Sequence, residues 1–348
     1  MGGTLFYLFE RKIYYFSPMK RTKIAGIGYH VPERIVFNRE LEDYMDTSDE
    51  WIRTRSGIKE RRWVESGMGT SDLAIEASKK AIKMADIDPK AIDLIIVGTL
   101  TSDYFFPGVS AQIQDALDIG TVGAFDVKAA CSAFIYSLSI GDQFIKTGEY
   151  KTVLVVGAEV QSTALDLSDS GRMTAVLFAD GAGAAVLTKN DGDSGILSTH
   201  LHCQGKYLKE LWCEGPSSRE NPRLSIDMIK EGRHFPSMNG REVFKNAVRR
   251  FPEVIKEAMD ANGFTIDDIS LIIPHQANER ITKTVRKKMG IEKSKLFSNI
   301  HKFGNTTGAS IPIALCDAYD QGIIFDEDII ILAAFGAGFT WASAAIRW

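Results

Sequence analysis

The chain has 348 residues, a length that accommodates one large domain or two of ordinary size with an ample interior. Hydrophobic residues make up 45% of the chain and charged residues 25%, a composition typical of globular rather than disordered proteins. The net charge of −4 gives no reason to expect nucleic acid as the main partner, and the four scattered cysteines are too few for a disulfide framework, so a reducing, cytoplasmic location is expected.

Residues 1–19 are expected to form an N-terminal extension. Their longest apolar run, residues 5–9, is followed by Glu10, Arg11 and Lys12, so it is too short for a membrane span and unlike the apolar region of a signal peptide. A strand-like segment begins at Lys23, shortly after Met19. The natural protein is therefore expected either to start at Met19 or to carry a poorly ordered extension before it.

Short apolar runs then alternate with longer helical patterns, which predicts an α/β architecture. Most of the apolar runs do not alternate with polar residues, as is typical of strands that are covered on both faces. Strands are predicted at residues 94–97, 123–127, 153–156, 184–187, 271–273 and 329–333. Helices are predicted at residues 71–85, 131–147, 241–261, 277–289 and 310–321.

Two pairs of these strands repeat at one spacing. The segments that begin at Ala91 and Asp268 resemble each other, as do those that begin at Val153 and Ile330, and both offsets are 177 residues (268 − 91 and 330 − 153). We therefore predict two duplicated βαβ-type halves, residues 20–190 and 191–348. Residues 200–240 have no counterpart in the first half and are interpreted as a surface insertion that covers a site.

The first candidate site residue is Cys131, within the sequence Ala-Ala-Cys-Ser-Ala. It lies between a predicted strand and a predicted helix, at or beside the helix N-terminus. The free N–H groups and the dipole of a helix N-terminus are expected to favour a thiolate and to lower the cysteine pKa. The alternative interpretation is a buried structural cysteine.

Three motifs in the second half supply candidate partners for this cysteine. His275 follows an apolar strand, at the sheet edge where α/β proteins place ligands, and Asn305 lies in a glycine-bounded loop before a helix. The backbone N–H of Ala337, in the turn after the last long strand, is expected to form an oxyanion hole together with the N–H of Cys131. The alternatives are a structural histidine and two ordinary turns.

Other combinations of residues do not form a recognisable site in the sequence. His200, His202 and Cys203 lack a second pair of ligands at the spacing of a zinc site, so no metal is expected. The glycine turns at residues 26–28 and 180–183 lack the third glycine and the acidic partner of a dinucleotide site. The sequence also contains no Gly-x-Ser-x-Gly nucleophile elbow.

Taken together, these motifs resemble those of the ketoacyl synthase III family, condensing enzymes with the thiolase fold. The resemblance extends from about residue 20 to Trp348 and is carried by residues 46–58, 129–132, 178–183, 274–278, 301–306 and 338–341. It implies a five-layered α/β/α/β/α arrangement of duplicated βαβαβ halves. The implied activity is decarboxylative Claisen condensation of an acyl-CoA with malonyl-acyl carrier protein, the initiating step of fatty acid synthesis. The resemblance also implies a cytoplasmic homodimer that uses coenzyme A and phosphopantetheine thioesters as substrates and no other cofactor.

The resemblance also assigns roles to individual residues. Cys131 matches the acyl-accepting nucleophile, and His275 and Asn305 match its two catalytic partners. The matches to substrate-binding residues are Trp51, Arg55 and Arg172 (coenzyme A nucleotide), Phe106 (closure of the acyl pocket of the dimer partner), and Asn278 and Arg280 (pantetheine and carrier protein). Two departures from the family pattern stand out. Ala337 replaces the commoner central glycine of its turn, which keeps the N–H for the oxyanion role but narrows the φ freedom. Residues 208–236 differ from those of the shortest family members, which leaves substrate choice open.

The residue types distinguish between relatives of this fold. A thiolase uses a second reactive cysteine near its C-terminus, whereas the last cysteine here, Cys316, lies in a predicted helix. Elongating synthases pair the cysteine with two histidines, so Asn305 indicates the initiating type, since an amide donates a hydrogen bond but does not remove a proton. A thiolase-fold acyltransferase or a non-decarboxylating enzyme of secondary metabolism is the alternative, and the preferred acyl chain stays open.

One predicted helix, at residues 277–289, is basic although the chain as a whole is acidic. Its basic face is expected to attract an acidic acyl carrier protein, because complementary charge steers such encounters. The alternative is a solvated helix face. The residues concerned are Arg280, Lys283, Arg286, Lys287 and Lys288.

Overall fold

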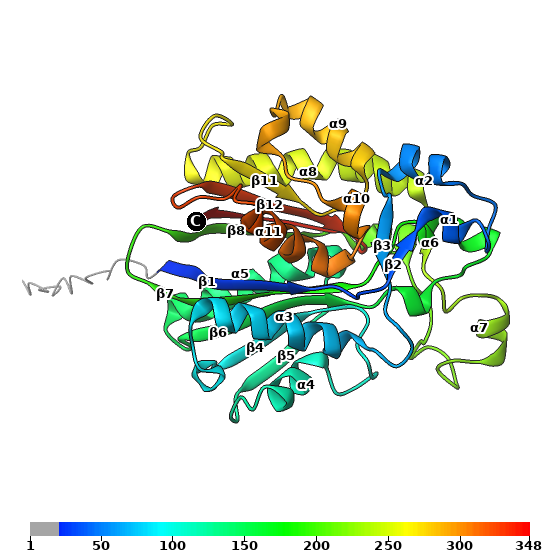
Figure 1. Ribbon diagram of the computed structural model, residues 1–348, viewed down its shortest axis with the longest axis horizontal. Helices are drawn as coiled ribbons and strands as arrows, with labels where there is room; N and C mark the ends of the chain where they lie inside the picture. Colours follow the sequence, from blue (N-terminus) through cyan, green and yellow to red (C-terminus); the bar gives the residue numbers. More distant parts are fainter. Residues whose placement is uncertain (1–20) are drawn as a thin grey trace, which may run out of the picture.

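The computed structural model describes residues 21–348, and the predicted extension with its alternative start at Met19 lies outside the described residues (Figure 1). Two sheets form the centre of the described part. The first has the strand order β1-β7-β6-β4-β5 and the second the order β11-β12-β13-β8. Their bounds are β1 Arg21–His30, β4 Leu94–Gly98, β5 Gly123–Val127, β6 Thr152–Glu159, β7 Gly181–Asn190, β8 Gly195–Cys203, β11 Leu271–Pro274, β12 Ile329–Gly336 and β13 Thr340–Arg347.

The helices lie in three layers around these sheets. In Figure 1, α8 and α9 cover the outer face of the second sheet, α3 and α4 cover the outer face of the first, and α5 and α11 lie between the sheets. The five-layered α/β/α/β/α arrangement is therefore confirmed. The helix bounds are α1 Asn38–Leu41, α2 Asp49–Ser56, α3 Thr70–Ala85, α4 Val109–Ala116, α5 Ala133–Thr147, α6 Arg172–Ala175, α7 Ile226–Lys230, α8 Gly240–Asn262, α9 Glu279–Met289, α10 Ile300–Phe303 and α11 Ser310–Asp320.

The internal repeat is visible in the strand register. β4 pairs in parallel with β6 so that Leu94 faces Val153, and β11 pairs in parallel with β12 so that Leu271 faces Ile330. Both pairs are related by the same offset of 177 residues (271 − 94 and 330 − 153). The predicted boundary at residue 190 falls in the turn that leads from β7 in one sheet to β8 in the other.

The middle layer explains why its two helices lack a polar face. Residues 310–318 of α11 are all buried, and α5 also buries most of its length, because each helix has a sheet on either side. A helix that is covered on one side needs only an apolar stripe. α9, for example, buries only Ile281, Thr282 and Val285.

The two halves approach each other closely at glycine residues. A Cβ atom on Gly157, in β6, would lie 2.5 Å from the carbonyl oxygen of Gly308 in the other half. Real Cβ atoms do not approach oxygen so closely, so this contact requires glycine. The backbone around the middle layer is therefore fixed on both sides.

Several predicted boundaries were wrong by a few residues. The helix predicted from residue 131 begins as a 3₁₀ turn, Ala130–Ser132, before α5 proper. The helix predicted from residue 277 begins at Glu279, because Asn278 caps it by accepting the N–H of Arg280 (2.9 Å).

The segment predicted as a surface insertion, residues 200–240, contains regular elements. β8 extends to Cys203, and the remainder holds α7 and the small sheet of β9 (Leu211–Trp212) and β10 (Ser237–Met238). A second small sheet pairs β2 (Ile35–Phe37) with β3 (Glu60–Arg62). Within residues 21–348, no helix has both the length and the apolar character needed to span a membrane.

Candidate active site

Cys131 lies where the chain leaves β5 and enters the middle layer. Ala130 before it adopts a left-handed conformation, with φ +48°, and the 3₁₀ turn then leads into α5. The side chain of Cys131 is buried, and Gly336 of the second sheet lies directly against it. A Cβ atom on Gly336 would be 3.0 Å from Sγ and 2.6 Å from Cβ of Cys131, so glycine is required for this approach.

Two backbone N–H groups converge on the sulfur of Cys131. They belong to Cys131 itself and to Ala337, and both hydrogen bonds lower the pKa of the thiol. The hydroxyl of Thr340 contacts both segments, since it lies 3.2 Å from the carbonyl oxygen of Ala129 and 3.1 Å from that of Ala337. The turn between β12 and β13 is thus a hairpin turn and also a source of N–H donors beside the cysteine.

The expected lowering of the Cys131 pKa was wrong. Burial raises the pKa of this thiol to about 12, with a further contribution from the carboxylate of Glu159, and these effects outweigh the two N–H groups. Glu159, at the end of β6, is itself fully buried, and burial raises its pKa to about 7. In the free protein at neutral pH, Cys131 therefore carries its proton.

His275 follows β11 and is held on both sides. Its backbone N–H donates to the carbonyl oxygen of Ala333 (2.7 Å), and its Nδ1 lies 2.5 Å from Oγ of Ser310, the first residue of α11. The Ser310 hydroxyl oxygen also accepts the N–H of Gln276 (3.2 Å), so its own hydrogen is free for Nδ1. When the Ser310 hydroxyl donates this hydrogen to Nδ1, the ring proton of the neutral imidazole is on Nε2. Burial lowers the pKa of His275 to about 3, which keeps the imidazole neutral.

Asn305 is fixed by its own backbone and by its side-chain oxygen. Its N–H donates to the carbonyl oxygen of Leu177, and its carbonyl oxygen accepts the N–H of Ala179 (both 2.9 Å). Oδ1 accepts the N–H of Thr307 (2.9 Å), which leaves the two hydrogens of Nδ2 as the free donors of the amide.

Cys131, His275 and Asn305 line one cavity of about 350 Å³. They come from three separate segments, so the fold brings together what the sequence separates. A larger cavity of about 1170 Å³ also reaches Cys131, lined partly by the segment predicted to cover a site, residues 200–240. The cysteine therefore lies where two cavities meet.

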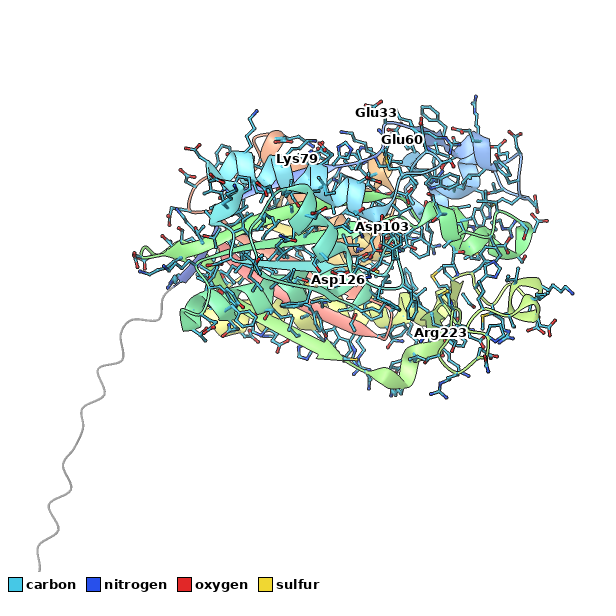
Figure 2. The ribbon with its side chains drawn as sticks, turned by 90° about the horizontal axis from the view of Figure 1, so that it is seen from below. Glu33, Glu60, Lys79, Asp103, Asp126 and Arg223 are labelled. Carbon is cyan, nitrogen blue, oxygen red and sulfur yellow. The ribbon has the colours of Figure 1, made fainter. Side chains whose placement is uncertain are left out.

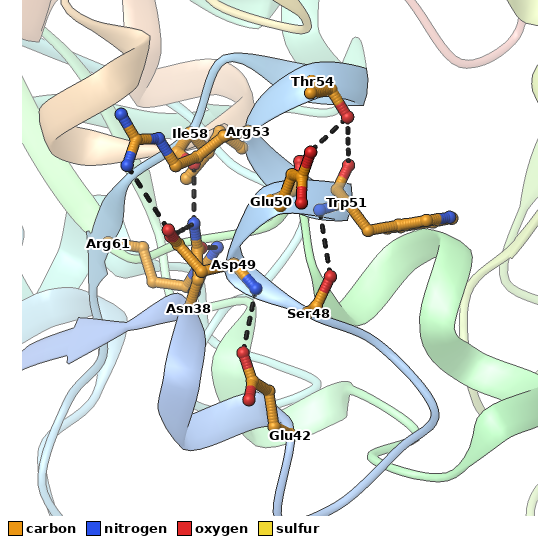
Figure 3. Close-up of polar contacts among 10 residues, drawn as sticks. All are labelled: Asn38, Glu42, Ser48, Asp49, Glu50, Trp51, Arg53, Thr54, Ile58 and Arg61. Atoms are coloured by element: carbon orange, nitrogen blue, oxygen red, sulfur yellow. Dashed lines mark hydrogen bonds and ion pairs between the residues drawn. The ribbon is translucent and has the colours of Figure 1, made fainter.

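The smaller cavity opens beside Trp51 in α2. The Ser48 hydroxyl caps this helix by accepting the Trp51 N–H (3.1 Å), and Asp49 is held by Asn38 and Arg53, as Figure 3 shows. The indole of Trp51 lies against two cationic groups. The guanidinium carbons of Arg55 and Arg172 are 4.8 and 5.0 Å from the centre of its ring.

Asn278, Arg280 and Phe106, the remaining candidates for substrate binding, differ in their position relative to the cavities. Asn278 lines the smaller cavity, but its amide already caps α9 and donates to the carbonyl oxygen of Arg55 (3.0 Å). Arg280 is exposed at the entrance and lies over Phe244 of α8, 5.8 Å from the ring centre. Phe106 is 78% exposed and does not line either of the two cavities that reach Cys131.

The predicted basic face of α9 is mostly present. Lys283, Lys287 and Lys288 are exposed together with Arg280. Arg286 differs, because it is half-buried and donates to the carbonyl oxygen of Ile291 at the end of the helix (3.2 Å). Lys283 also pairs with Glu279 of the same helix (2.9 Å).

Several residues of the site were not found from the sequence. Ser310 orients His275, Thr307 orients Asn305, and Glu159 adds its charge beside Cys131. Ser310 and Glu159 act across contacts between distant segments, which no local motif marks. Thr307 lies two residues from Asn305 in the same glycine-bounded loop and contributes its backbone N–H. His200 and His202 share the carboxylate of Glu257, but the described residues contain no group of three potential ligands placed to hold a metal ion.

The comparisons with known proteins agree with one another. Residues 125–205 match the family described as 3-oxoacyl-[acyl-carrier-protein (ACP)] synthase III, and residues 259–348 match its C-terminal domain family. The chain is 45% identical over 325 residues to the beta-ketoacyl-[acyl-carrier-protein] synthase III of Caldanaerobacter subterraneus, covering 93% of this chain and 97% of the relative. It is 44% identical to synthase III 1 of Bacillus anthracis over 93% of this chain and 98% of the relative. The crystal structure of the 3-oxoacyl-[acyl-carrier-protein] synthase III from Aquifex aeolicus superposes with a TM-score of 0.87 at 42% identity, covering 94% of this chain and all of that one.

Proposed function

Because the chain belongs to the 3-oxoacyl-[acyl-carrier-protein] synthase III family, we propose that it condenses an acyl-CoA with malonyl-acyl carrier protein and releases CO₂. The product is a 3-ketoacyl thioester on the carrier protein, which starts fatty acid synthesis. One observation carries this proposal: a thiol, a neutral imidazole and an amide donor line the same cavity. The thiol can accept an acyl group, and the imidazole and the amide can donate hydrogen bonds that stabilise an enolate.

In the first half-reaction the sulfur of Cys131 attacks the thioester carbon of the acyl-CoA. A carbon–sulfur bond forms to Cys131, the bond to coenzyme A breaks, and the Cys131 proton ends on the departing thiolate. The N–H groups of Cys131 and Ala337 stabilise the tetrahedral oxyanion. The high pKa of the buried thiol fits this route, because its proton is transferred during the reaction rather than lost beforehand.

In the second half-reaction a malonyl thioester occupies the smaller cavity. Its thioester oxygen accepts hydrogen bonds from Nε2 of His275 and Nδ2 of Asn305, so loss of CO₂ leaves a stabilised enolate. The enolate carbon forms a bond to the carbonyl carbon of acyl-Cys131, the carbon–sulfur bond breaks, and the departing cysteine thiolate takes a proton from water. Neither partner needs to accept a proton, which fits a histidine whose pKa is about 3.

The entrance of the smaller cavity supports the assignment of both thioester carriers. Trp51, Arg55 and Arg172 offer an aromatic face and two cations for the coenzyme A nucleotide. The exposed basic residues of α9, beginning with Arg280 at the same entrance, offer a surface for an acidic carrier protein. We propose that the enzyme uses these thioesters and no metal or further cofactor.

A homodimer is supported by an uncovered sheet edge. β5 pairs only with β4 in the described part of the chain, and Phe125 on it is exposed. The loop beside this edge carries Phe105 and Phe106, which are 69% and 78% exposed. Asp103 and Asp126 hold the two ends of that loop by accepting the backbone N–H groups of Ser71 and Val109. The guanidinium of Arg223 lies 4.5 Å from the ring centre of Phe105. Asp103, Asp126 and Arg223 are labelled in Figure 2. We propose that Phe106 reaches the acyl cavity of the partner.

A cytoplasmic location is proposed from the thiols. Cys131, Cys203, Cys213 and Cys316 are all free, and the proposed reaction requires a reduced Cys131. This location also holds the coenzyme A and carrier-protein substrates.

The proposed function is tested in two steps. Incubation with acetyl-CoA should add one acetyl group to Cys131 by intact mass, and Cys131→Ala should abolish the addition. Malonyl-acyl carrier protein labelled in its free carboxyl group should then release labelled CO₂ from the acylated enzyme. Acylation without CO₂ release would contradict a condensing enzyme and favour an acyltransferase.

A further inference from the structure

The larger cavity contains a buried amide in a wall that is otherwise mostly apolar. Gln161 lies two residues after β6 and is only 6% exposed, yet it lines the same cavity as Cys131. Its backbone N–H donates to the buried carboxylate of Asp180 (2.7 Å), which fixes the position of the residue. Apolar residues nearby in this wall include Leu100, Val160 and Phe178.

The orientation of the Gln161 amide follows from its neighbours. Nε2 lies 3.2 Å from the hydroxyl oxygen of Thr307 and 3.5 Å from a carboxylate oxygen of Glu159. The Thr307 hydroxyl donates its own hydrogen to the Glu159 carboxyl, so a flipped amide would place its oxygen against a hydroxyl oxygen that has no hydrogen left to bond it. Oε1 is therefore the atom directed away from Glu159.

Oε1 faces the cavity without a partner. Within residues 21–348 no donor bonds this oxygen, and it is not fully buried. Water can satisfy this oxygen while the cavity is empty. An apolar group that displaces the water leaves the acceptor unpaired, which is unfavourable in a buried site.

The two cavities divide the substrate between them. The smaller cavity contains the proposed enolate donors and the entrance beside Trp51, so it holds the thioester and its carrier arm. The larger cavity is then the space left for the acyl chain on Cys131. Thus, the acyl chain leaves Cys131 along a wall that includes the apolar residues Leu100, Val160 and Phe178 and the buried amide of Gln161.

We propose that Gln161 is a specificity-determining residue that rejects unbranched acyl chains long enough to cover its side-chain oxygen. This inference rests on the proposed function, since it concerns which acyl group is loaded onto Cys131. The substrate class that it selects is a short acyl-CoA. A chain of two to four carbons leaves the amide hydrated, whereas a longer one must desolvate it.

The test compares acylation rates of Cys131 by intact mass with acetyl-, butyryl-, hexanoyl- and octanoyl-CoA. In the native protein, acetyl- and butyryl-CoA should react fastest. Gln161→Met, which has a similar volume and no carbonyl oxygen, should raise the hexanoyl-to-acetyl rate ratio about tenfold, the usual scale for one buried unpaired acceptor. The ratio cancels any general loss of activity caused by the missing bonds to Thr307 and Glu159.

Two further variants keep the test decisive. Gln161→Leu serves if the methionine variant folds poorly, and Thr163→Val, a similar loss of polarity at an exposed position lining the same cavity, should leave the ratio unchanged. The inference is overturned if the native protein reacts with octanoyl-CoA as fast as with acetyl-CoA. It is also overturned if Gln161→Met and Gln161→Leu keep the native ratio. Failure of every acyl-CoA to modify Cys131 would instead overturn the proposed function.

Discussion

The two halves of the molecule have the same backbone at the site but different side chains. The 3₁₀ turns Ala130–Ser132 and Thr307–Ala309 are related by the same 177-residue offset as the strands (307 − 130). Both begin with a non-glycine residue in the left-handed region, Ala130 at φ +48° and Thr307 at φ +46°. Both lead directly into a middle helix, α5 and α11. The strained turn is thus a property of the repeated fold rather than of the cysteine.

At equivalent positions, one half carries a functional side chain where the other has glycine. Cys131 corresponds to Gly308, Glu159 to Gly336, and His275 to Gly98, all at the 177-residue offset. Gly336 gives room to Cys131, and Gly308 gives room to Glu159, since a Cβ on Gly308 would be 3.1 Å from a Glu159 oxygen. The comparison shows how a duplicated fold forms an asymmetric site: Cys131 and Glu159 each occupy space that a glycine of the opposite half leaves empty.

The largest expected effect comes from removing either of the two side-chain donors of the second half, His275 or Asn305. His275→Ala and Asn305→Ala should each slow CO₂ release from malonyl-acyl carrier protein by about 10²–10³-fold, because each removes one donor to the enolate oxygen. Acylation of Cys131 by acetyl-CoA should change less than tenfold. Labelled CO₂ release and intact mass measure the two steps separately. Equal losses in both steps would show that the halves do not divide the reaction.

The next effect comes from adding a side chain where the second half has none. Gly336→Ala places a Cβ atom 2.6 Å from Cβ of Cys131, so either the hairpin or the cysteine must move. Acylation should slow by about 10–100-fold, and the protein should lose roughly 1–3 kcal/mol of stability from overpacking. Gly120→Ala is a matched control, since nothing lies within 4 Å of its added Cβ. Native acylation rates in Gly336→Ala would mean that the close approach is not needed.

A pH effect distinguishes Glu159 from its glycine counterpart. The pKa of Glu159 is raised from 4.5 to about 7, so between these values the folded state retains a proton that the unfolded state has released. The free energy of unfolding should therefore fall as the pH rises from about 4.5 to about 7, by roughly 1–3 kcal/mol from this group. Urea unfolding at pH 5 and pH 8 should show that Glu159→Gln reduces the fall, whereas Glu149→Gln at an exposed position does not. An unchanged fall in Glu159→Gln would contradict a protonated Glu159.

The smallest expected effect concerns the basic face of α9, which begins at Arg280 beside the smaller cavity, whereas the exposed lysines of α3 in the first half do not line that cavity. Lys283→Glu combined with Lys287→Glu should raise the KM for malonyl-acyl carrier protein by about 3–10-fold, and the increase should shrink at high salt. The rate with malonyl-CoA should stay near native, because the change acts on the protein partner. Lys83→Glu on α3 is the matched control for charge. An equal KM increase for both malonyl carriers would place the effect in the cavity instead.

The repeat and the candidate residues Cys131, His275 and Asn305 could be predicted from the sequence, because the signals for them lie in short segments of the chain. Buried strands are apolar, and a cysteine, a histidine and an asparagine at strand or helix ends mark turns that open toward a site. The pKa of Cys131 was predicted in the wrong direction, because it depends on burial by Gly336 and on the charge of Glu159, both from distant parts of the chain. The orientation of Gln161 depends on Thr307 in the other half and has no local pattern. Likewise, the sequence predicts Arg286 as part of the basic face, but its side chain instead donates to the carbonyl oxygen of Ile291, just after the helix.

The shared middle layer also has a consequence for how the protein is made. The inner face of the first sheet is covered partly by α11, which contacts β1 and β7, so that face cannot be completed when the first half leaves the ribosome. At a synthesis rate of about 5–20 residues per second, the interval between the end of β7 at Asn190 and the end of α11 at Asp320 is on the order of ten seconds. During that interval a nascent chain exposes the apolar inner face of the first sheet, and we expect chaperones to bind that face.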